Sequence, residues 1–168
     1  MQSLDEITQA LARTLADRQL RVVFAESCTA GLAAATLASV PGISAYLCGS
    51  AVTYREQTKQ DWLRVSAEDL ARFTAVSEPV ARQMATGVLE NTVEADVSAA
   101  ITGHLGPEAP AELDGVVYVA VAQRQAQTVR VTSVERVVLA TSTRSERQRE
   151  ATGLLLNCLK SSVEMDFV

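Results

Sequence analysis

Three short polar segments of this 168-residue chain combine hydroxyl groups, glycines and one lysine, which are residue types that could do chemistry. Residues 26–31 read Glu-Ser-Cys-Thr-Ala-Gly, residues 102–107 read Thr-Gly-His-Leu-Gly-Pro, and between them Thr53-Tyr54 is followed by Lys59. A serine hydroxyl becomes a useful nucleophile when a base lies beside it, and a lysine that is withdrawn from water can be that base. The hydroxyls of these segments are therefore candidate nucleophiles and Lys59 is a candidate base, but the residues alone assign no pair.

Each of these residues also has an ordinary structural interpretation, and spacing alone does not choose between the two. Ser27 and Thr29 are typical helix N-caps, a lysine in a helix is typical of a solvated face, and Cys28 is typical of a small buried side chain. His104 is the only histidine, so any Ser-His-Asp or Cys-His scheme must use it. The pattern alone indicates an α/β domain with a candidate site for a small anion, and it indicates no particular reaction.

Hydrophobic periodicity places the polar segments at the ends of predicted strands. The predicted helices cover residues 3–18, 30–39, 55–63, 78–93 and 144–161, and the predicted strands cover 21–25, 44–54, 96–101, 116–122 and 128–139. Ser66, with Asp69 three residues later, indicates the start of a further short helix. The connection at 124–127 is short enough for an antiparallel hairpin. This order predicts one three-layer α/β/α domain over residues 1–168, with helices on both faces of a mixed sheet. Ligands of such open sheets bind beyond the carboxyl ends of the strands.

Composition narrows the class of protein. Apolar residues make up 48% of the chain and aromatic residues only 4%, so the core must be built from small aliphatic side chains that allow close helix-on-sheet packing. A net charge of −5 and a pI near 4.9 do not suit a nucleic-acid-binding protein. The three cysteines are widely spaced, which indicates neither a disulfide framework nor a zinc site. With no signal peptide and no apolar run of the ~20 residues that span a bilayer, we expect a cytoplasmic protein that does not bind a membrane.

Several motifs, in order along nearly the whole chain, resemble those of the CinA C-terminal family. The family's AESCTGG resembles residues 25–31, and its VPGSSAYF with the following glycine-rich run into VAY resembles 40–54. Its AVSEEVARxMAxG resembles residues 75–87, its TGIAGP resembles 102–107 and its GLVYIA resembles 115–120. The lysine five positions beyond the family's tyrosine falls on Lys59.

Active members of that family hydrolyse nicotinamide mononucleotide to nicotinate mononucleotide and ammonia, and the resemblance implies the same activity here. It places the catalytic roles on Ser27, Lys59 and Tyr54, and substrate binding on Thr29, Gly31, Thr102, Gly103 and Arg144. Backbone N–H groups at the start of the helix after Ser27 are expected to hold the oxyanion. The expected partner is a small nucleotide substrate. No metal or other cofactor is expected, because no ligand cluster with suitable spacing is present. The resemblance also implies a homo-oligomer, with a dimer favoured.

The chain departs from the family pattern at three places. Ala30 replaces the first glycine of the family's pair, His104-Leu105 replaces Ile-Ala, and the tail of the second loop carries Glu108 and Glu112. These changes leave two alternatives open. One is a nucleotide-binding paralogue without catalytic activity. The other is a hydrolase of a different small amide that recruits His104, with a Cys28–His104 thiol mechanism as a variant.

Overall fold

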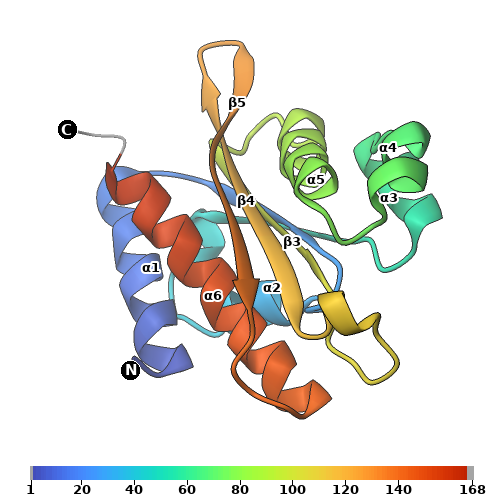
Figure 1. Cartoon of the computed structure of the whole chain (residues 1–168). Coiled ribbons are helices and arrows are strands. Elements are labelled where there is room, and N and C mark those ends of the chain that lie inside the picture. The colour runs from blue at the N-terminus through green and yellow to red at the C-terminus, as the bar shows by residue number, and fades with distance from the viewer. Residues whose placement is uncertain (1, 166–168) are drawn as a thin grey trace.

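A five-stranded sheet is the frame on which the polar segments are placed. The computed structural model describes residues 2–165, and its strands lie in the order β2-β1-β3-β4-β5 (Figure 1). β1 (Val22–Glu26) pairs in parallel with β2 (Leu47–Val52) on one side and with β3 (Val97–Gly103) on the other. β4 (Val116–Gln125) is antiparallel to β3, and β5 (Thr128–Val138) returns antiparallel to β4. The predicted mixed sheet and its C-terminal hairpin are confirmed.

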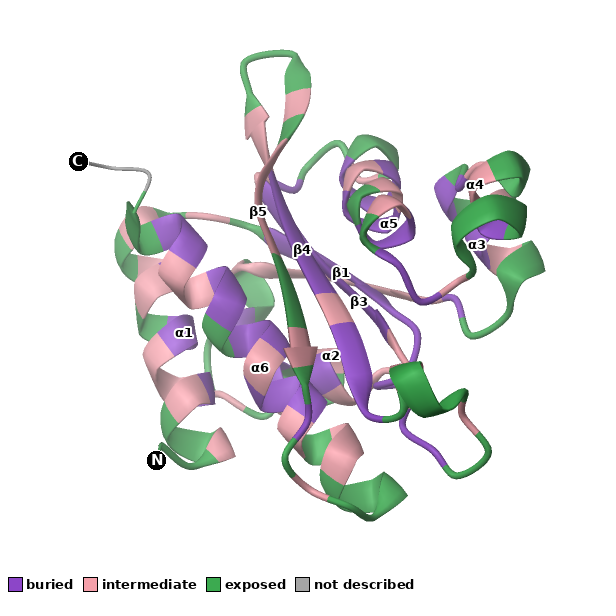
Figure 2. Cartoon of the chain, in the orientation of Figure 1, coloured by how far each residue is buried: buried purple, intermediate pink, exposed green. Residues whose placement is uncertain are grey.

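Helices cover both faces of this sheet. The helices on one face are α1 (Leu4–Arg18), α2 (Leu32–Ala38) and α6 (Arg144–Met165), and those on the other are α3 (Glu56–Leu63), α4 (Ala67–Phe73) and α5 (Glu78–Asn91). The central strands are buried between the two layers (Figure 2). The chain therefore forms the three-layer α/β/α domain that the sequence predicts.

The α5 face of the sheet is built from very small residues. Ala25, Ala100, Ala120 and Ala122 present their side chains to α5, all fully buried. The small side chains let α5 lie close to the sheet. On α5, a Cβ at Gly87 would lie 2.0 Å from the backbone carbonyl oxygen of Leu63, the last residue of α3. The absent side chain thus lets α3 pack against α5, and α3 is the helix that carries Lys59.

Some element boundaries differ from the prediction. The predicted extended run over 44–54 begins with a 3-10 turn at Ile43–Ala45, which follows Gly42 in the left-handed conformation (φ 87°). α2 is only seven residues long, because residues 27–31 form a turn before it. The predicted loop at 106–115 contains a 3-10 turn at Ala111–Leu113. The start of α4 is as predicted, since the Ser66 side chain accepts a hydrogen bond from the N–H of Asp69.

Candidate functional site

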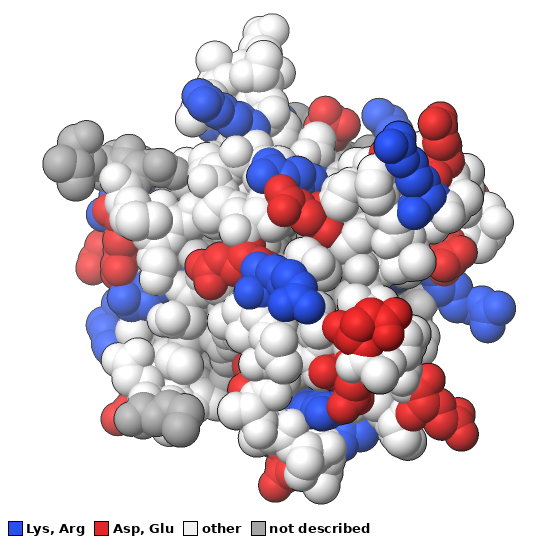
Figure 3. All heavy atoms as spheres, viewed as in Figure 1, with Lys and Arg blue, Asp and Glu red and all other residues white. Residues whose placement is uncertain are grey.

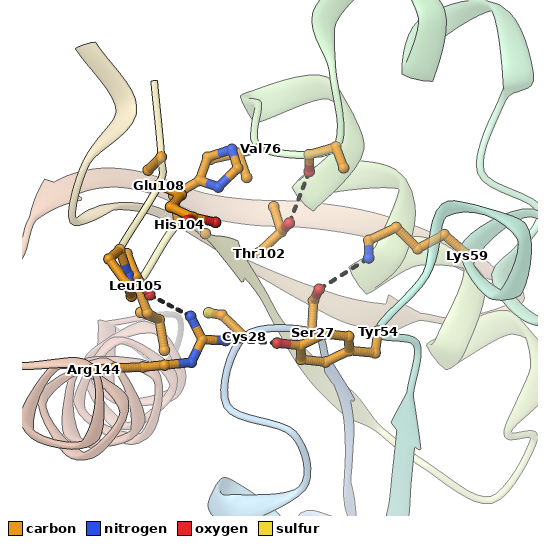
Figure 4. A pocket seen from close by; sticks show the side chains of 15 residues that line it. Ser27, Cys28, Tyr54, Lys59, Val76, Thr102, His104, Leu105, Glu108 and Arg144 are labelled. Atoms are coloured by element: carbon orange, nitrogen blue, oxygen red, sulfur yellow. Dashed lines mark hydrogen bonds between the residues drawn. The ribbon is translucent and has the colours of Figure 1, made fainter. Parts of the chain in front are cut away.

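The three polar segments converge at one edge of the sheet. β1, β2 and β3 are parallel neighbours, so their carboxyl ends lie together. They open onto a cavity of about 290 Å³ (Figure 4). The cavity is lined by residues from the ends of the three strands, the segment before α5, the second loop and the start of α6: Ser27, Cys28, Tyr54, Lys59, Ala75, Val76, Thr102, Gly103, Leu105 and Arg144, with His104 and residues 106–109. Six of the eight predicted site residues therefore line one cavity although they are far apart in sequence.

Ser27 and Lys59 form a direct contact in the cavity wall. The Lys59 Nζ donates a hydrogen bond of 2.9 Å to the Ser27 Oγ and one of 2.6 Å to the backbone carbonyl oxygen of Thr53. Figure 4 shows the two side chains pointing toward one another, Ser27 from the end of β1 and Lys59 from α3. Ser27 is itself fixed to the sheet, because its N–H donates to the carbonyl oxygen of Ile101 on β3. The amine is therefore held between the hydroxyl and a fixed carbonyl.

Burial changes the protonation of this lysine. Lys59 is only 1% exposed, and the loss of water around its amine lowers its pKa from 10.5 to about 8. Cys28 and Glu56 act weakly in the opposite direction. With a pKa near 8, roughly a tenth of the amine is neutral at pH 7, whereas an exposed lysine would be almost fully protonated. A neutral amine 2.9 Å from a hydroxyl can accept its proton.

Glu26, the residue before Ser27, is a buried carboxylate that organises the turn. Its Oε2 accepts hydrogen bonds from the Thr29 hydroxyl (2.6 Å) and from the N–H groups of Gly31 and Ala33 (both 3.0 Å). Its Oε1 accepts from the N–H of Ala34 and, in a bond that reaches β2, from the hydroxyl of Ser50. An anion at the start of a helix is stabilised both by these donors and by the helix dipole. Glu26 therefore ties β1, the turn, α2 and β2 together beneath Ser27.

This network corrects two expectations about residues 27–31. The N-cap of α2 is Gly31, in the left-handed conformation at φ 95°, and neither Ser27 nor Thr29 caps the helix with its side chain. The N–H groups at the start of α2 donate to Glu26, so they are not available to an oxyanion. Thr29 and Gly31 do not line the cavity. The structure places these two residues in the support of the turn and not beside a substrate.

Tyr54 and Arg144 form the open side of the cavity. The Arg144 guanidinium donates to the Tyr54 hydroxyl oxygen (2.7 Å) and to the carbonyl oxygen of Gly106 (2.5 Å). Arg144 is the first residue of α6, so this contact joins segments 90 and 38 residues apart in the chain. The Tyr54 side chain is 55% exposed and retains its own hydroxyl proton for a ligand. The pair suits a negatively charged group that enters from solvent.

Thr102 and Gly103 line the cavity, and both also have structural contacts. The Thr102 hydroxyl donates to the carbonyl oxygen of Ala75, which fixes the segment before α5 against β3. A Cβ at Gly103 would lie 2.4 Å from Val117 Cγ1 and 2.9 Å from the Val116 carbonyl oxygen. Close packing against β4 therefore accounts for this glycine without a ligand.

The residues that depart from the family pattern lie in different places. His104 and Glu108 line the cavity on the side away from Lys59, whereas Ala30 and Glu112 are exposed and do not line it. The buried Cys28 also contacts the cavity, and burial raises the pKa of its thiol to about 12. Reactive cysteines have lowered pKa values, so the structure does not favour the thiol variant.

Sequence reasoning assigned no role to several residues of the site. Glu26 could have been found, because an acidic residue that ends an apolar strand just before a helix is a recognisable signal. Gln148 on α6 donates to the carbonyl oxygens of Thr29 (3.2 Å) and Cys28 (3.5 Å), and Ala75 and Val76 form part of the cavity wall. No local signal marks these contacts, because they join segments that only the fold brings together.

The face of the molecule drawn in Figure 3 carries mixed charge. In the view of Figure 3, basic and acidic side chains are interspersed, and acidic ones lie over the second loop, which contains Glu108, Glu112 and Asp114.

Among residues 2–165, no helix combines the length and apolar character needed to cross a membrane. The same part of the chain contains no group of three or more His, Cys, Asp or Glu side chains that could hold a metal ion.

Solved structures with this fold cover the whole chain. The competence damage-inducible protein A (ComA) of Klebsiella pneumoniae superposes with a TM-score of 0.88 at 30% identity, over 98% of this chain and 99% of that one. A competence-damaged protein (CinA) superfamily protein of Escherichia coli superposes with a TM-score of 0.84 at 33% identity, over 95% and 90% of the two chains. Both therefore share the complete α/β/α domain.

Curated relatives give the same family. Protein YdeJ of Escherichia coli is 43% identical over 106 residues, which are 63% of this chain and 61% of that protein. A CinA-like protein of Prochlorococcus marinus is 35% identical over 158 residues, or 93% of this chain but only 36% of the relative. The chain thus spans between about a third and three fifths of the length of these relatives. The model of the CinA C-terminal domain matches residues 4–163. The chain belongs to the CinA C-terminal domain family.

Proposed function

We propose that this protein is an amidohydrolase that converts nicotinamide mononucleotide to nicotinate mononucleotide and ammonia. The observation that carries the proposal is the 2.9 Å contact between the Ser27 Oγ and the Nζ of a fully buried lysine, at the wall of an open cavity. A hydroxyl with a base in hydrogen-bond reach is the minimal arrangement for nucleophilic catalysis. Membership of the CinA C-terminal family adds the expected substrate.

The proposed reaction begins with proton transfer to the lysine. Neutral Lys59 accepts the proton of the Ser27 hydroxyl while one of its own N–H groups donates to the Thr53 carbonyl oxygen, a bond that keeps Nζ in place. The Ser27 oxygen attacks the carboxamide carbon, and the C–N bond then breaks. The leaving amine takes the proton from Lys59 and departs as ammonia.

Water completes the cycle. Once ammonia has left, Lys59 is neutral again and can accept a proton from a water molecule that attacks the ester carbon. The C–O bond to Ser27 breaks, the proton returns to the Ser27 oxygen, and nicotinate mononucleotide is released. Each step uses the same 2.9 Å contact.

The open side of the cavity supports a substrate with a phosphate group. Arg144 offers a planar fork of N–H donors, and the Tyr54 hydroxyl next to it offers a further donor. At about 290 Å³ the cavity is just below the usual range for small-molecule sites, ~300–1,000 Å³, which suits a mononucleotide better than a larger ligand. Glu108 is the one carboxylate among the described residues that line the cavity.

Ammonia release from nicotinamide mononucleotide tests the proposal. The wild-type chain should release ammonia in proportion to enzyme concentration, and Ser27→Ala, which removes only the hydroxyl oxygen, should release none above background. The alternative of a non-catalytic nucleotide-binding protein makes a different prediction. Saturable binding by calorimetry, without ammonia from either chain, would establish that alternative and remove the amidase.

A further inference from the structure

Two arginines on the first turn of α6 hold consecutive carbonyl groups of the second loop. Arg144 donates to the carbonyl oxygen of Gly106 at 2.5 Å, and Arg147 donates to that of Leu105 at 3.3 Å. Arg144 faces the cavity, whereas Arg147 does not line it. Any shift of residues 105–106 relative to α6 would therefore move the Gly106 carbonyl group, which orients Arg144.

Arg147 also fixes the other end of the same loop. Its guanidinium makes two parallel hydrogen bonds to the Asp114 carboxylate, at 2.7 and 3.0 Å, and its Nε donates to the Thr141 carbonyl oxygen at 2.9 Å. The Arg147 side chain is only 12% exposed. The hydrogen bonds from Arg147 lower the pKa of Asp114 below its usual 3.8, so the carboxylate is charged at neutral pH. Such a two-point pair is more strongly oriented than an ordinary surface ion pair.

Two glycines make room for this guanidinium. Gly106 and Gly115 are both in the left-handed conformation, at φ 66° and 71°. A Cβ at Gly106 would lie 3.0 Å from Arg147 Nη1, and a Cβ at Gly115 would lie 3.2 Å from its Cζ. The backbone at both ends of the loop is thus folded directly against Arg147, and the N–H of Gly115 donates to the His104 carbonyl oxygen to close the loop.

We propose that Arg147 and Asp114 are positioning residues that set the place of the 104–115 loop and, through Gly106, the direction of Arg144. The inference rests on the proposed function in one respect, namely that Arg144 binds the phosphate of the substrate. Neither Arg147 nor Asp114 lines the cavity that contains the Ser27–Lys59 contact. It therefore governs how tightly the charged end of the substrate is held and not the rate of the chemical step.

The test compares KM and kcat for nicotinamide mononucleotide in three variants. Asp114→Asn and Arg147→Lys both break the paired hydrogen bonds, and Arg147→Lys does so without a change of charge. Glu112→Gln is the matched control, because it removes one negative charge from an exposed position of the same loop. We expect KM to rise by about tenfold in the first two variants, the size of one lost charge-assisted hydrogen bond, with kcat within twofold of wild type.

The sign of the effect separates positioning from simple electrostatics. Removal of a carboxylate near a phosphate site lowers KM if charge alone acts, so Glu112→Gln should leave KM unchanged or slightly lower. A rise in KM for Asp114→Asn therefore requires the positioning role. Unchanged or lowered KM in that variant, or a fall in kcat without a rise in KM, would overturn the proposal.

Hydrogen exchange of residues 104–115 makes the result independent of turnover. We expect the loop amides to exchange at least about tenfold faster in Asp114→Asn and Arg147→Lys than in the wild type. The exchange rates of the α1 amides should not change. If the wild-type chain releases no ammonia, the amidase proposal fails, and the affinity for nicotinamide mononucleotide replaces KM as the readout. Faster exchange with weaker binding then supports the positioning role, whereas unchanged exchange, unchanged affinity or no binding by any of the chains rejects it.

Discussion

The cavity has a buried end at Ser27 and Lys59 and an exposed end at Tyr54, Arg144 and the second loop. At the buried end, Ser27 is 8% exposed and Lys59 is 1% exposed. Each donates a hydrogen bond to a backbone carbonyl oxygen, Ser27 through its N–H and Lys59 through its Nζ. At the other end Tyr54 is 55% exposed, and its hydroxyl is held by an arginine from a distant helix. The two ends therefore differ in solvent access as well as in position.

The difference in solvent access suits the two roles that we propose for these ends, catalysis and substrate binding. A lysine acts as a base near neutral pH only if burial lowers its pKa, so the chemical end has to be dry and rigid. Recognition of an anion needs only oriented donors, which work at the edge of solvent and can be moved by the loop that holds them. Changes at the buried end should therefore alter rate and stability, and changes at the exposed end should alter affinity.

The largest expected effect is the loss of activity when the buried amine is removed. Lys59→Met keeps the length and apolar stem of the side chain but offers no base, so kcat should fall by about 10³-fold or more. The folded state should not become less stable, because the desolvation of a buried amine is removed as well. Ammonia release and thermal unfolding of the same sample check both expectations. Residual activity within tenfold of wild type would exclude Lys59 as the base.

The next effect in size concerns the support of the buried end. Glu26→Gln replaces an acceptor of five hydrogen bonds with a side chain whose amide group faces N–H donors, and we expect a loss of about 2–4 kcal/mol in the free energy of unfolding. Urea unfolding measures this loss. Glu112→Gln makes the same chemical change at an exposed position and should lower the free energy of unfolding by less than ~0.5 kcal/mol. Equal stability of the two variants would contradict the role assigned to Glu26.

The pH dependence of the rate should report the buried lysine. In the proposed mechanism Lys59 acts in its neutral form, and its pKa is lowered to about 8, so kcat/KM should rise as pH increases through 8 and then level off. Between pH 7 and pH 9 the neutral fraction grows by about tenfold. The same lowered pKa means that the folded chain binds fewer protons than the unfolded chain between pH 8 and 10.5, so stability should rise across that window. A flat profile from pH 7 to 9 would show that no group of this kind limits the rate.

The smallest expected effect lies outside the cavity, at Ala30. This exposed residue has φ 53°, in the left-handed region that disfavours a side chain. Ala30→Gly should therefore raise the free energy of unfolding by about 0.5–1 kcal/mol and leave kcat and KM unchanged, because residue 30 does not line the cavity. A change in KM in this variant would show that the departure from the family's glycine pair does affect the substrate site.

The sequence predicts the elements of the fold better than it predicts the contacts between distant segments. The order of helices and strands and the mixed sheet follow from periodicity. The Ser27–Lys59 pair, whose partners are 32 residues apart, is expected only from the resemblance to the CinA C-terminal family. The hydrogen-bond partner of the N–H groups at the start of α2 could not be predicted, because it depends on the direction of the Glu26 side chain at the end of β1. The Arg147–Asp114 pair could not be predicted either, since its partners are 33 residues apart and meet only when α6 packs beside the second loop. Sequence patterns predict helices, strands and their local contacts. Contacts between segments that are distant in the chain can be identified only in the folded structure.

The central claim is that Ser27 becomes covalently attached to the substrate. Rapid acid quenching during turnover of nicotinamide mononucleotide, followed by intact-mass and peptide analysis, tests it most directly. We predict an added mass equal to the nucleotide minus ammonia, located on the peptide that contains Ser27 and absent from Ser27→Ala. Ammonia release at a normal rate from Ser27→Ala, or an adduct on Cys28 in its place, would contradict the account.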